Sequence, residues 1–115
     1  MNISEVTYSA GTPIDGYGDG FWRIGGSAWH GAVLVLPSGP VAWTGGPEQV
    51  IAAAADVDVL LLGTGAEIAH ADLALREALE AAGIGVEAMA SAQAARTYNV
   101  LLGEGRRVAC ALTPI

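Results

Sequence analysis

Residues 85–112, GVEAMASAQAARTYNVLLGEGRRVACAL, decide the fold of this 115-residue chain. The mostly apolar run Ile84–Met89 predicts a buried strand, and Ser91 is a candidate N-cap for the helix that follows it. A second apolar run, Val108–Leu112, predicts another buried strand after the glycine turn that ends the helix. The inward-facing stripe of the helix is expected to consist of Ala94, Tyr98, Leu101 and Leu102. The stretch is therefore a strand–helix–strand unit with polar residues in its connections.

The upstream sequence predicts that this unit completes an α/β domain, in which an N-terminal β-meander precedes a β-α-β-α-β order around a central mixed sheet. Residues 11–20, GTPIDGYGDG, are rich in glycine and are expected to form a surface loop or irregular lead-in. One helix is expected to start at Pro47, and a second to run from an N-cap at Asp72 to a stop at Gly83. The other strands are predicted within Ile3–Tyr8, Phe21–Ile24, Ser27–Leu36, Val41–Trp43 and Val57–Leu62.

Length and composition predict one domain, spanning residues 1–115. Hydrophobic residues make up 52% of the chain and charged residues 15%, which is too apolar for a disordered protein. The net charge is −7, and the five basic residues are all arginines. An acidic chain repels the phosphates of nucleic acids and of anionic membrane surfaces, so neither is an expected partner.

No segment of the sequence is expected to cross a membrane. Residues 24–47 carry no formal charge, but six glycines and three prolines interrupt them. The longest apolar run among them, Ala32–Leu36, is far below the ~20 residues that a transmembrane helix needs. The N-terminus lacks the basic and apolar regions of a signal peptide. Cys110 is the only cysteine, so no internal disulfide can form, and a soluble, cytoplasmic protein is expected.

The glycine-rich turn at the end of Leu60–Gly65, LLLGTG, lies where α/β folds bind ligands, and it is a candidate phosphate cradle. The dinucleotide fingerprint is incomplete, because its third glycine would fall at Ile68. No P-loop motif exists in a chain without lysine. A plain tight turn is the favoured interpretation.

The residue types that hold metals or act as nucleophiles do not form a recognisable set. His30 and His70 have no cysteine or carboxylate partner at ligand spacing, so neither a metal nor a cofactor is expected. Cys110 lies within an apolar strand and is expected to be a buried, inert thiol. The chain has no GxSxG motif, and nothing in the sequence places Ser91 beside His70. No catalytic residue is assigned.

Glu87, Arg96 and Asn99 are the most suggestive polar set. Glu87 interrupts an apolar strand, where a carboxylate needs a partner or a cleft. Arg96 and Asn99 are three residues apart on the following helix and are expected to share one of its faces. A structural Glu87–Arg96 pair is the favoured interpretation. The alternative is a binding cleft, which would be formed by Gly63, Thr64, Gly65, Glu87, Arg96 and Asn99.

Three tryptophans, Trp22, Trp29 and Trp43, lie in the predicted N-terminal meander. Most are expected in the core. At least one is expected to be partly exposed, because large aromatic side chains dominate the energetics of protein interfaces.

The chain resembles the Mth-like domain of unknown function family. The resemblance is carried by residues 86–91 (VEAMAS), by Ala94, by residues 96–99 (RTYN), by Leu102, by residues 104–106 (EGR) and by Val108. It extends upstream to residues 17–21, to the Ala32–Pro37 strand, to Trp43 and to residues 62–65, so it covers nearly the whole chain. Ser91 stands where the family usually has threonine, and either hydroxyl serves as a cap.

The resemblance implies a compact three-layer β+β/α fold around a mixed sheet, and no established catalytic residues. The family includes an assembly factor of mitochondrial respiratory complex I, which acts with a partner protein. No mitochondrial presequence is expected from the N-terminal residues, which fits a bacterial-type member.

The leading hypothesis is therefore a non-enzymatic protein-interaction module that resembles the complex I assembly factor. Its expected partners are protein subunits of a respiratory or membrane complex. The alternative is a small-molecule or anion binding protein, or an enzyme, that uses the cleft near Gly63–Gly65. A third interpretation is a self-associating module, which forms a homodimer.

Overall fold

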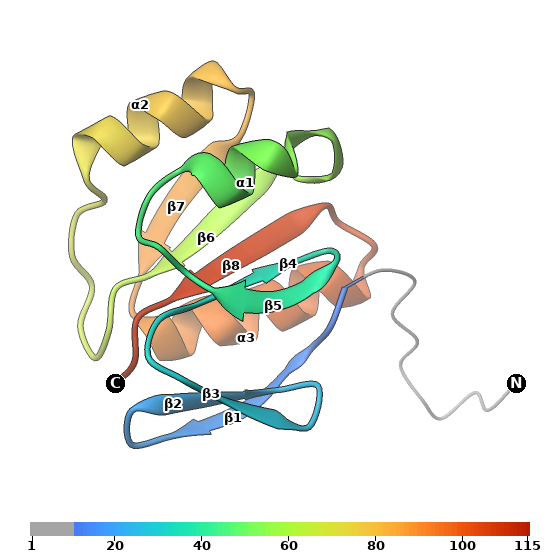
Figure 1. Ribbon diagram of the computed structural model, residues 1–115, viewed down its shortest axis with the longest axis vertical. Coiled ribbons are helices and arrows are strands. Elements are labelled where there is room, and N and C mark those ends of the chain that lie inside the picture. The colour runs from blue at the N-terminus through green and yellow to red at the C-terminus, as the bar shows by residue number, and fades with distance from the viewer. Residues whose placement is uncertain (1–10) are drawn as a thin grey trace, which may run out of the picture.

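The computed structural model of the protein describes residues 11–115, so the strand predicted within Ile3–Tyr8 lies outside the described residues. A five-stranded sheet in the order β5-β4-β8-β6-β7 is the centre of the fold (Figure 1). β6 pairs in parallel with β7 and β8, while β4 pairs antiparallel with β5 and β8, so the predicted mixed sheet is confirmed. The strands are β4 (Val33–Leu36), β5 (Gly39–Ala42), β6 (Val59–Gly63), β7 (Gly85–Met89) and β8 (Val108–Leu112).

The inner strands are apolar because both of their faces are covered. Leu60 and Leu62 of β6 belong to one buried cluster, whereas Leu61 between them belongs to a second cluster on the opposite face. All five residues of β8 are buried in the same alternating way. A continuous apolar run is what a strand between two cores requires, as the sequence predicted.

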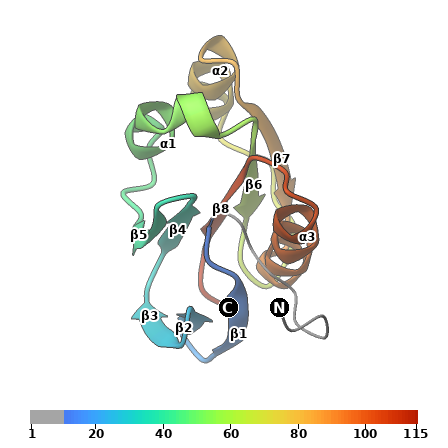
Figure 2. The ribbon, with the colours of Figure 1, turned by 90° about the vertical axis from the view of Figure 1, so that its right-hand side faces the viewer.

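Two different layers cover the two faces of this sheet. Helices α1 (Glu48–Ala52) and α2 (Leu73–Ala81) pack on one face, with the short helix η1 (Ala54–Asp56) after α1. Helix α3 (Ser91–Gly103) packs on the other face together with a three-stranded sheet, as the turned view in Figure 2 shows. The predicted three-layer β+β/α fold is thus confirmed. No helix among residues 11–115 is long and apolar enough to cross a membrane.

The N-terminal strands differ from the prediction in two places. Part of the segment predicted as a surface loop is strand β1 (Ile14–Gly18), which pairs antiparallel with β2 (Phe21–Ile24). The predicted single strand Ser27–Leu36 is two strands, β3 (Ser27–His30) in the small sheet and β4 in the large one. Gly31 separates them with a φ of +79°, a conformation that ends an extended strand and sends the chain across to the other sheet.

The tryptophans meet the expectation. Trp22 of β2 is fully buried in the core beneath α3, while Trp29 and Trp43 are partly exposed. The indole N–H of Trp43 donates to the carbonyl of Gly46 at 3.1 Å, so its polar edge is satisfied.

The signals at the ends of α2 are confirmed. The Asp72 carboxylate accepts a hydrogen bond from the Leu75 N–H at 3.1 Å. At the other end Gly83 has a φ of +84°, and the N–H of Ile84 donates to the carbonyl of Leu79 at 2.9 Å. This is a Schellman ending, and it turns the chain directly into β7.

The expected cap of α3 is wrong. Ala90 is the N-cap, without a side-chain hydrogen bond, and Ser91 is the first helical residue. Ser91 sits against the end of β6, where the chain has Gly63. A Cβ added at Gly63 would lie 2.8 Å from the Ser91 hydroxyl and 2.9 Å from its Cα, closer than real Cβ atoms approach. The glycine therefore permits the contact between β6 and the start of α3.

We expect Gly63→Ala to lower the free energy of unfolding by about 1–3 kcal/mol, because the added methyl group must displace the backbone of α3. Gly85→Ala on neighbouring β7 is the matched control. Its Cβ would meet atoms only at 3.8 Å and beyond, so stability should stay the same or rise by up to about 1 kcal/mol. Urea denaturation of both variants measures the difference. Equal stabilities would show that the close approach has no energetic weight.

Candidate functional site

The Gly63–Gly65 turn at the carboxyl end of β6 is fully engaged by its own chain. The Ser91 hydroxyl accepts a hydrogen bond from the Gly65 N–H at 2.7 Å and donates one to the Thr113 carbonyl at 2.7 Å. The Thr64 N–H donates to the Met89 carbonyl at 2.9 Å. Ser91 is 0% exposed. A phosphate cradle needs free backbone N–H groups, and here those of Thr64 and Gly65 are already used.

Asn99 fastens α3 to the small sheet. Its side-chain amide N–H donates to the Ile14 carbonyl at 2.7 Å, and its amide oxygen accepts from the Ile14 N–H at 2.9 Å. The side chain thus imitates a paired strand for one residue of β1. On the same helix the Tyr98 hydroxyl donates to the Thr12 carbonyl at 3.0 Å. The Asn99 side-chain amide therefore holds α3 against β1.

Glu87 and Arg96 do not meet. Both are exposed, and the Arg96 guanidinium donates to the Gln93 amide oxygen at 2.8 Å on its own helix. Among residues 11–115 no ion pair joins Glu87 to Arg96. Gly63, Thr64 and Gly65 are consecutive at the end of β6, whereas Glu87 lies on β7 and both Arg96 and Asn99 lie on α3.

Two cavities lie elsewhere on the molecule, and none of the six predicted residues lines them. The first, of about 410 Å³, lies where α3 leads into β8 and includes Arg106 and Arg107. The second, of about 320 Å³, lies between the β6–α2 loop and the outer strand β7. Its lining residues are Ile68, Ala69, His70, Ala71, Arg76 and Ala88.

Arg76 is the polar residue at the second cavity whose place the sequence did not predict. Its guanidinium donates to the Val86 carbonyl on β7 at 2.9 Å and lies 3.9 Å from the Glu80 carboxylate. Only the packing of α2 beside β7 places it there. Helical periodicity alone therefore could not predict the contact between Arg76 and the Val86 carbonyl.

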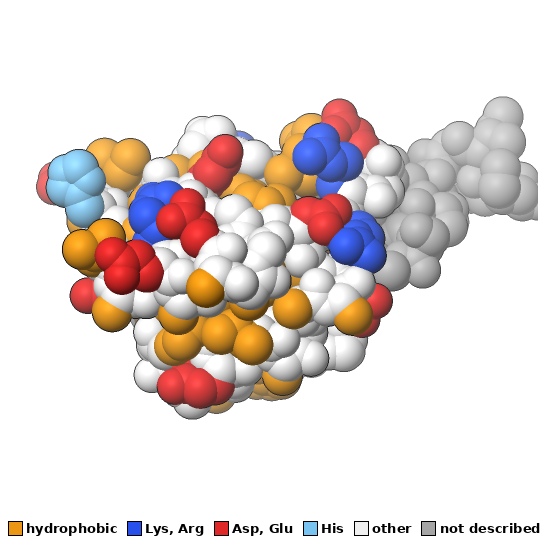
Figure 3. Space-filling view, turned by 90° about the horizontal axis from the view of Figure 1, so that it is seen from above, with side chains coloured by type: hydrophobic (Ala, Val, Ile, Leu, Met, Phe, Trp, Pro, Cys, Tyr) orange, Lys and Arg blue, Asp and Glu red, His pale blue; other side chains and the backbone are white. Residues whose placement is uncertain are grey.

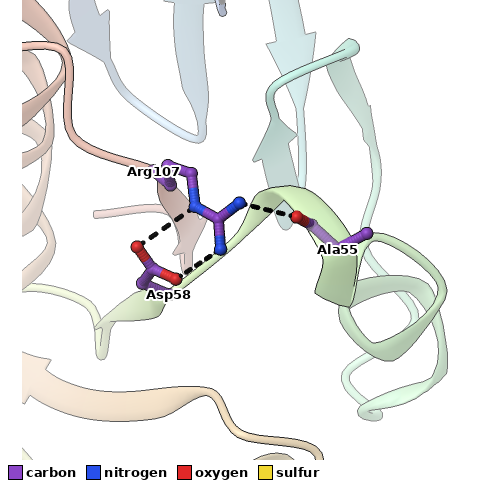
Figure 4. A network of polar contacts seen from close by, with 3 residues as sticks. All are labelled: Ala55, Asp58 and Arg107. Carbon is purple, nitrogen blue, oxygen red and sulfur yellow. Dashed lines mark hydrogen bonds and ion pairs between the residues drawn. The ribbon is translucent and has the colours of Figure 1, made fainter.

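The Arg107 side chain joins three segments near the first cavity (Figure 4). It binds the Asp58 carboxylate through two hydrogen bonds, at 2.7 and 3.2 Å, and donates to the Ala55 carbonyl at 2.8 Å. The hydrogen bond from Arg107 holds the pKa of the Asp58 carboxyl below its usual value. The pair is exposed to solvent, so its stabilising effect is screened by salt.

The remaining candidate groups lie apart from one another. His30 and His70 are exposed, and no group of three or more histidine, cysteine, aspartate or glutamate side chains in residues 11–115 could hold a metal. Cys110 is fully buried in β8, and burial raises the pKa of its thiol far above the usual value. The thiol is therefore protonated at neutral pH, as expected of an inert cysteine.

The chain is similar to known proteins over nearly its whole length. A family model described as "Protein of unknown function (DUF498/DUF598)" matches residues 14–113. An uncharacterised protein of Rhodobacter capsulatus is 47% identical, over 100% of this chain and 94% of the relative. The Danio rerio protein named NADH dehydrogenase (ubiquinone) 1 alpha subcomplex assembly factor 3 is 32% identical, over 99% of this chain and 71% of the relative.

The fold is also found among solved structures. A Mth938-like domain of Bordetella pertussis, solved by NMR, superimposes with a TM-score of 0.78. It is 28% identical in sequence, and the match covers 99% of this chain and 92% of the other.

We expect Asn99→Ala to lower the free energy of unfolding by about 1–3 kcal/mol, because it leaves the Ile14 N–H and carbonyl without partners. Arg96→Ala, three residues earlier on the same helix, is the control and should change stability by no more than about 0.5 kcal/mol. Denaturation in urea compares the two. If Asn99→Ala were as stable as the wild type, the two hydrogen bonds would not be a structural clamp.

The Asp58–Arg107 pair predicts a pH-dependent contribution to stability. Because the pKa of Asp58 is lower in the folded state, the carboxylate stabilises the fold above its unfolded pKa of about 3.9, and this contribution is lost as the pH falls through the folded pKa. Wild type should therefore be more stable than Asp58→Asn at pH 7, and the difference should shrink as acid is added.

The melting temperatures of wild type and Asp58→Asn, measured between pH 7 and pH 2.5, test this expectation. At pH 7 the difference should also shrink in 1 M salt, which screens exposed pairs. A difference that stayed constant with pH would mean that Asp58 acts through packing and not through its charge.

Proposed function

We propose that this chain, which belongs to the DUF498/DUF598 family of proteins of unknown function, is a non-enzymatic protein-interaction module that helps a respiratory or other membrane complex to assemble. The observation that carries the proposal is the 32% identity to the Danio rerio complex I assembly factor over 99% of this chain. A match of that extent includes both sheets and the helices that pack on them. The recognition surface that serves assembly would therefore belong to the shared domain.

Exposed apolar side chains support a role in binding proteins. Ile68 is 68% exposed and Leu73 65%. Large aliphatic side chains left in water gain free energy when a partner covers them, and neighbouring ones mark interaction sites. Subunits of a membrane complex awaiting assembly expose matching apolar surface, so they are chemically suitable partners. We infer that the protein acts in the cytoplasm. We also infer that residues 1–115 form one domain.

Deletion of the gene in the native host should lower the amount of assembled complex I and its NADH-oxidising activity in membranes. Re-expression of the wild-type chain should restore both. Native gel electrophoresis measures the assembled complex, and fractionation shows the compartment. In parallel, the tagged chain should retain subunits of a respiratory or membrane complex on an affinity column.

The control for the affinity experiment is the same tag on an unrelated acidic domain, because a charge of −7 alone attracts basic proteins. Normal complex I in the deletion strain, together with no respiratory or membrane-complex subunit among the retained proteins, would refute the proposal.

A further inference from the structure

Strand β7 is an edge of the large sheet, because it pairs only with β6. The Gly85 N–H donates to the Asp58 carbonyl and the Met89 carbonyl accepts from the Thr64 N–H, so Gly85, Glu87 and Met89 turn their peptide groups towards β6. By alternation the peptide groups of Val86 and Ala88 point away from the sheet. Figure 1 shows β7 as the outermost strand beside α2.

The outward groups of β7 are mostly unused. Within the described chain, the Val86 carbonyl is bound by the Arg76 guanidinium at 2.9 Å. No hydrogen bond from residues 11–115 reaches the N–H groups of Val86 and Ala88 or the carbonyl of Ala88. A row of free donors and acceptors of this kind is a template for another strand.

Space and apolar surface lie beside this edge. The cavity of about 320 Å³ separates the β6–α2 loop from Ala88, and Ile68 lines it. Leu73, the first residue of α2, is also largely exposed. A strand entering along β7 would therefore gain backbone hydrogen bonds from the edge and apolar contacts from this loop. Arg76 would then release Val86 and retain its neighbour Glu80 on the same helix.

The charge around the edge determines the kind of strand that fits. Residues 67–87 contain five carboxylates against a single arginine, a net charge of −4. The carboxylates are all exposed and belong to Glu67, Asp72, Glu77, Glu80 and Glu87. Figure 3 shows acidic side chains on the α2 side of the molecule with exposed hydrophobic side chains between them. Opposite charge attracts a basic segment.

We propose that the β7 edge binds an extended, basic segment of a partner protein, which adds to the large sheet as a sixth strand. The inference rests on the proposed function and names the surface and chemistry of the partner. A second copy of this chain is disfavoured as the occupant, because it would bring its own acidic edge against this one. The occupant is therefore a different, positively charged chain.

The probe is a blocked seven-residue peptide that alternates lysine and valine, titrated into the isotopically labelled protein at low salt. We expect saturable binding, slower amide hydrogen exchange at Val86 and Ala88, and weakening in higher salt. The same peptide with glutamate in place of lysine should not bind. Perturbations confined to β5, the other edge of the sheet, would overturn the proposal.

Ala88→Pro tests the backbone pairing. Proline removes an N–H that points away from β6, so the ladder with β6 keeps its hydrogen bonds. We expect peptide affinity to fall at least about fivefold, the effect of one lost hydrogen bond. Ala88→Ser keeps the N–H at similar size and should bind like wild type. Equal affinity of Ala88→Pro and Ala88→Ser would refute strand addition.

Ile68→Ser provides a second test that does not involve the strand backbone. It should weaken peptide binding at least about threefold by removing apolar contact. Val100→Ser, at an exposed aliphatic residue on α3, is the matched control and should leave binding unchanged. Equal effects of the two variants would overturn the proposed position of the segment.

The host experiment separates this inference from the proposed function. Complementation of the deletion strain by wild type but not by Ala88→Pro supports both. Full complementation by both chains keeps the assembly function and refutes the edge as its binding surface. Sedimentation of the free protein tests whether a second copy of this chain occupies the edge. A dimer that the Ala88→Pro substitution dissociates would show that it does and would refute the proposal.

Discussion

The hydroxyl of Ser91 is the interaction on which the carboxyl end of the large sheet depends. It joins the turn after β6 to the segment after β8, at 2.7 Å on each side, and it does so from the first residue of α3. The three elements can meet only because Gly63 has no side chain. In the apolar interior an unpaired hydroxyl would cost free energy, whereas one that both accepts and donates fixes a unique arrangement. The turn that most resembles a ligand-binding turn therefore has a structural role in joining β6, β8 and α3.

The sequence predicted those elements that are marked by a run of neighbouring apolar residues or by a single capping residue. The runs at β6, β7 and β8 and the capping of α2 by Asp72 follow from periodicity and from the chemistry of single residues. β1 was missed because two of its five residues are glycine, and its strand conformation comes from pairing with β2. The break at Gly31 was missed because an apolar run indicates burial but not which sheet covers it.

The hydrogen-bond partners of the candidate site residues were harder to predict, for a related reason. Arg96 and Asn99 are neighbours on α3, yet Arg96 remains in solvent while Asn99 binds β1, an element that the sequence did not predict. The contact of Arg76 with the Val86 carbonyl could not be predicted either, because helical periodicity cannot identify an open strand edge as a partner. Polar residues that bind backbone groups need tertiary structure to be interpreted, because their partners carry no sequence signal.

The way in which α2 ends restricts where related chains can gain or lose residues. The N–H groups of Gly83 and Ile84 donate to the last turn of α2, and β7 begins at the next residue. A residue inserted here would shift the register of β7 by one position and expose its apolar side chains to water. Residues 66–70 are exposed and lie outside both β6 and α2, so an insertion there leaves the register of β7 unchanged. Insertions and deletions accumulate where the backbone tolerates them. Evolution can thus vary the β6–α2 loop beside the β7 edge, and with it the choice of partner, while the strand itself keeps its register.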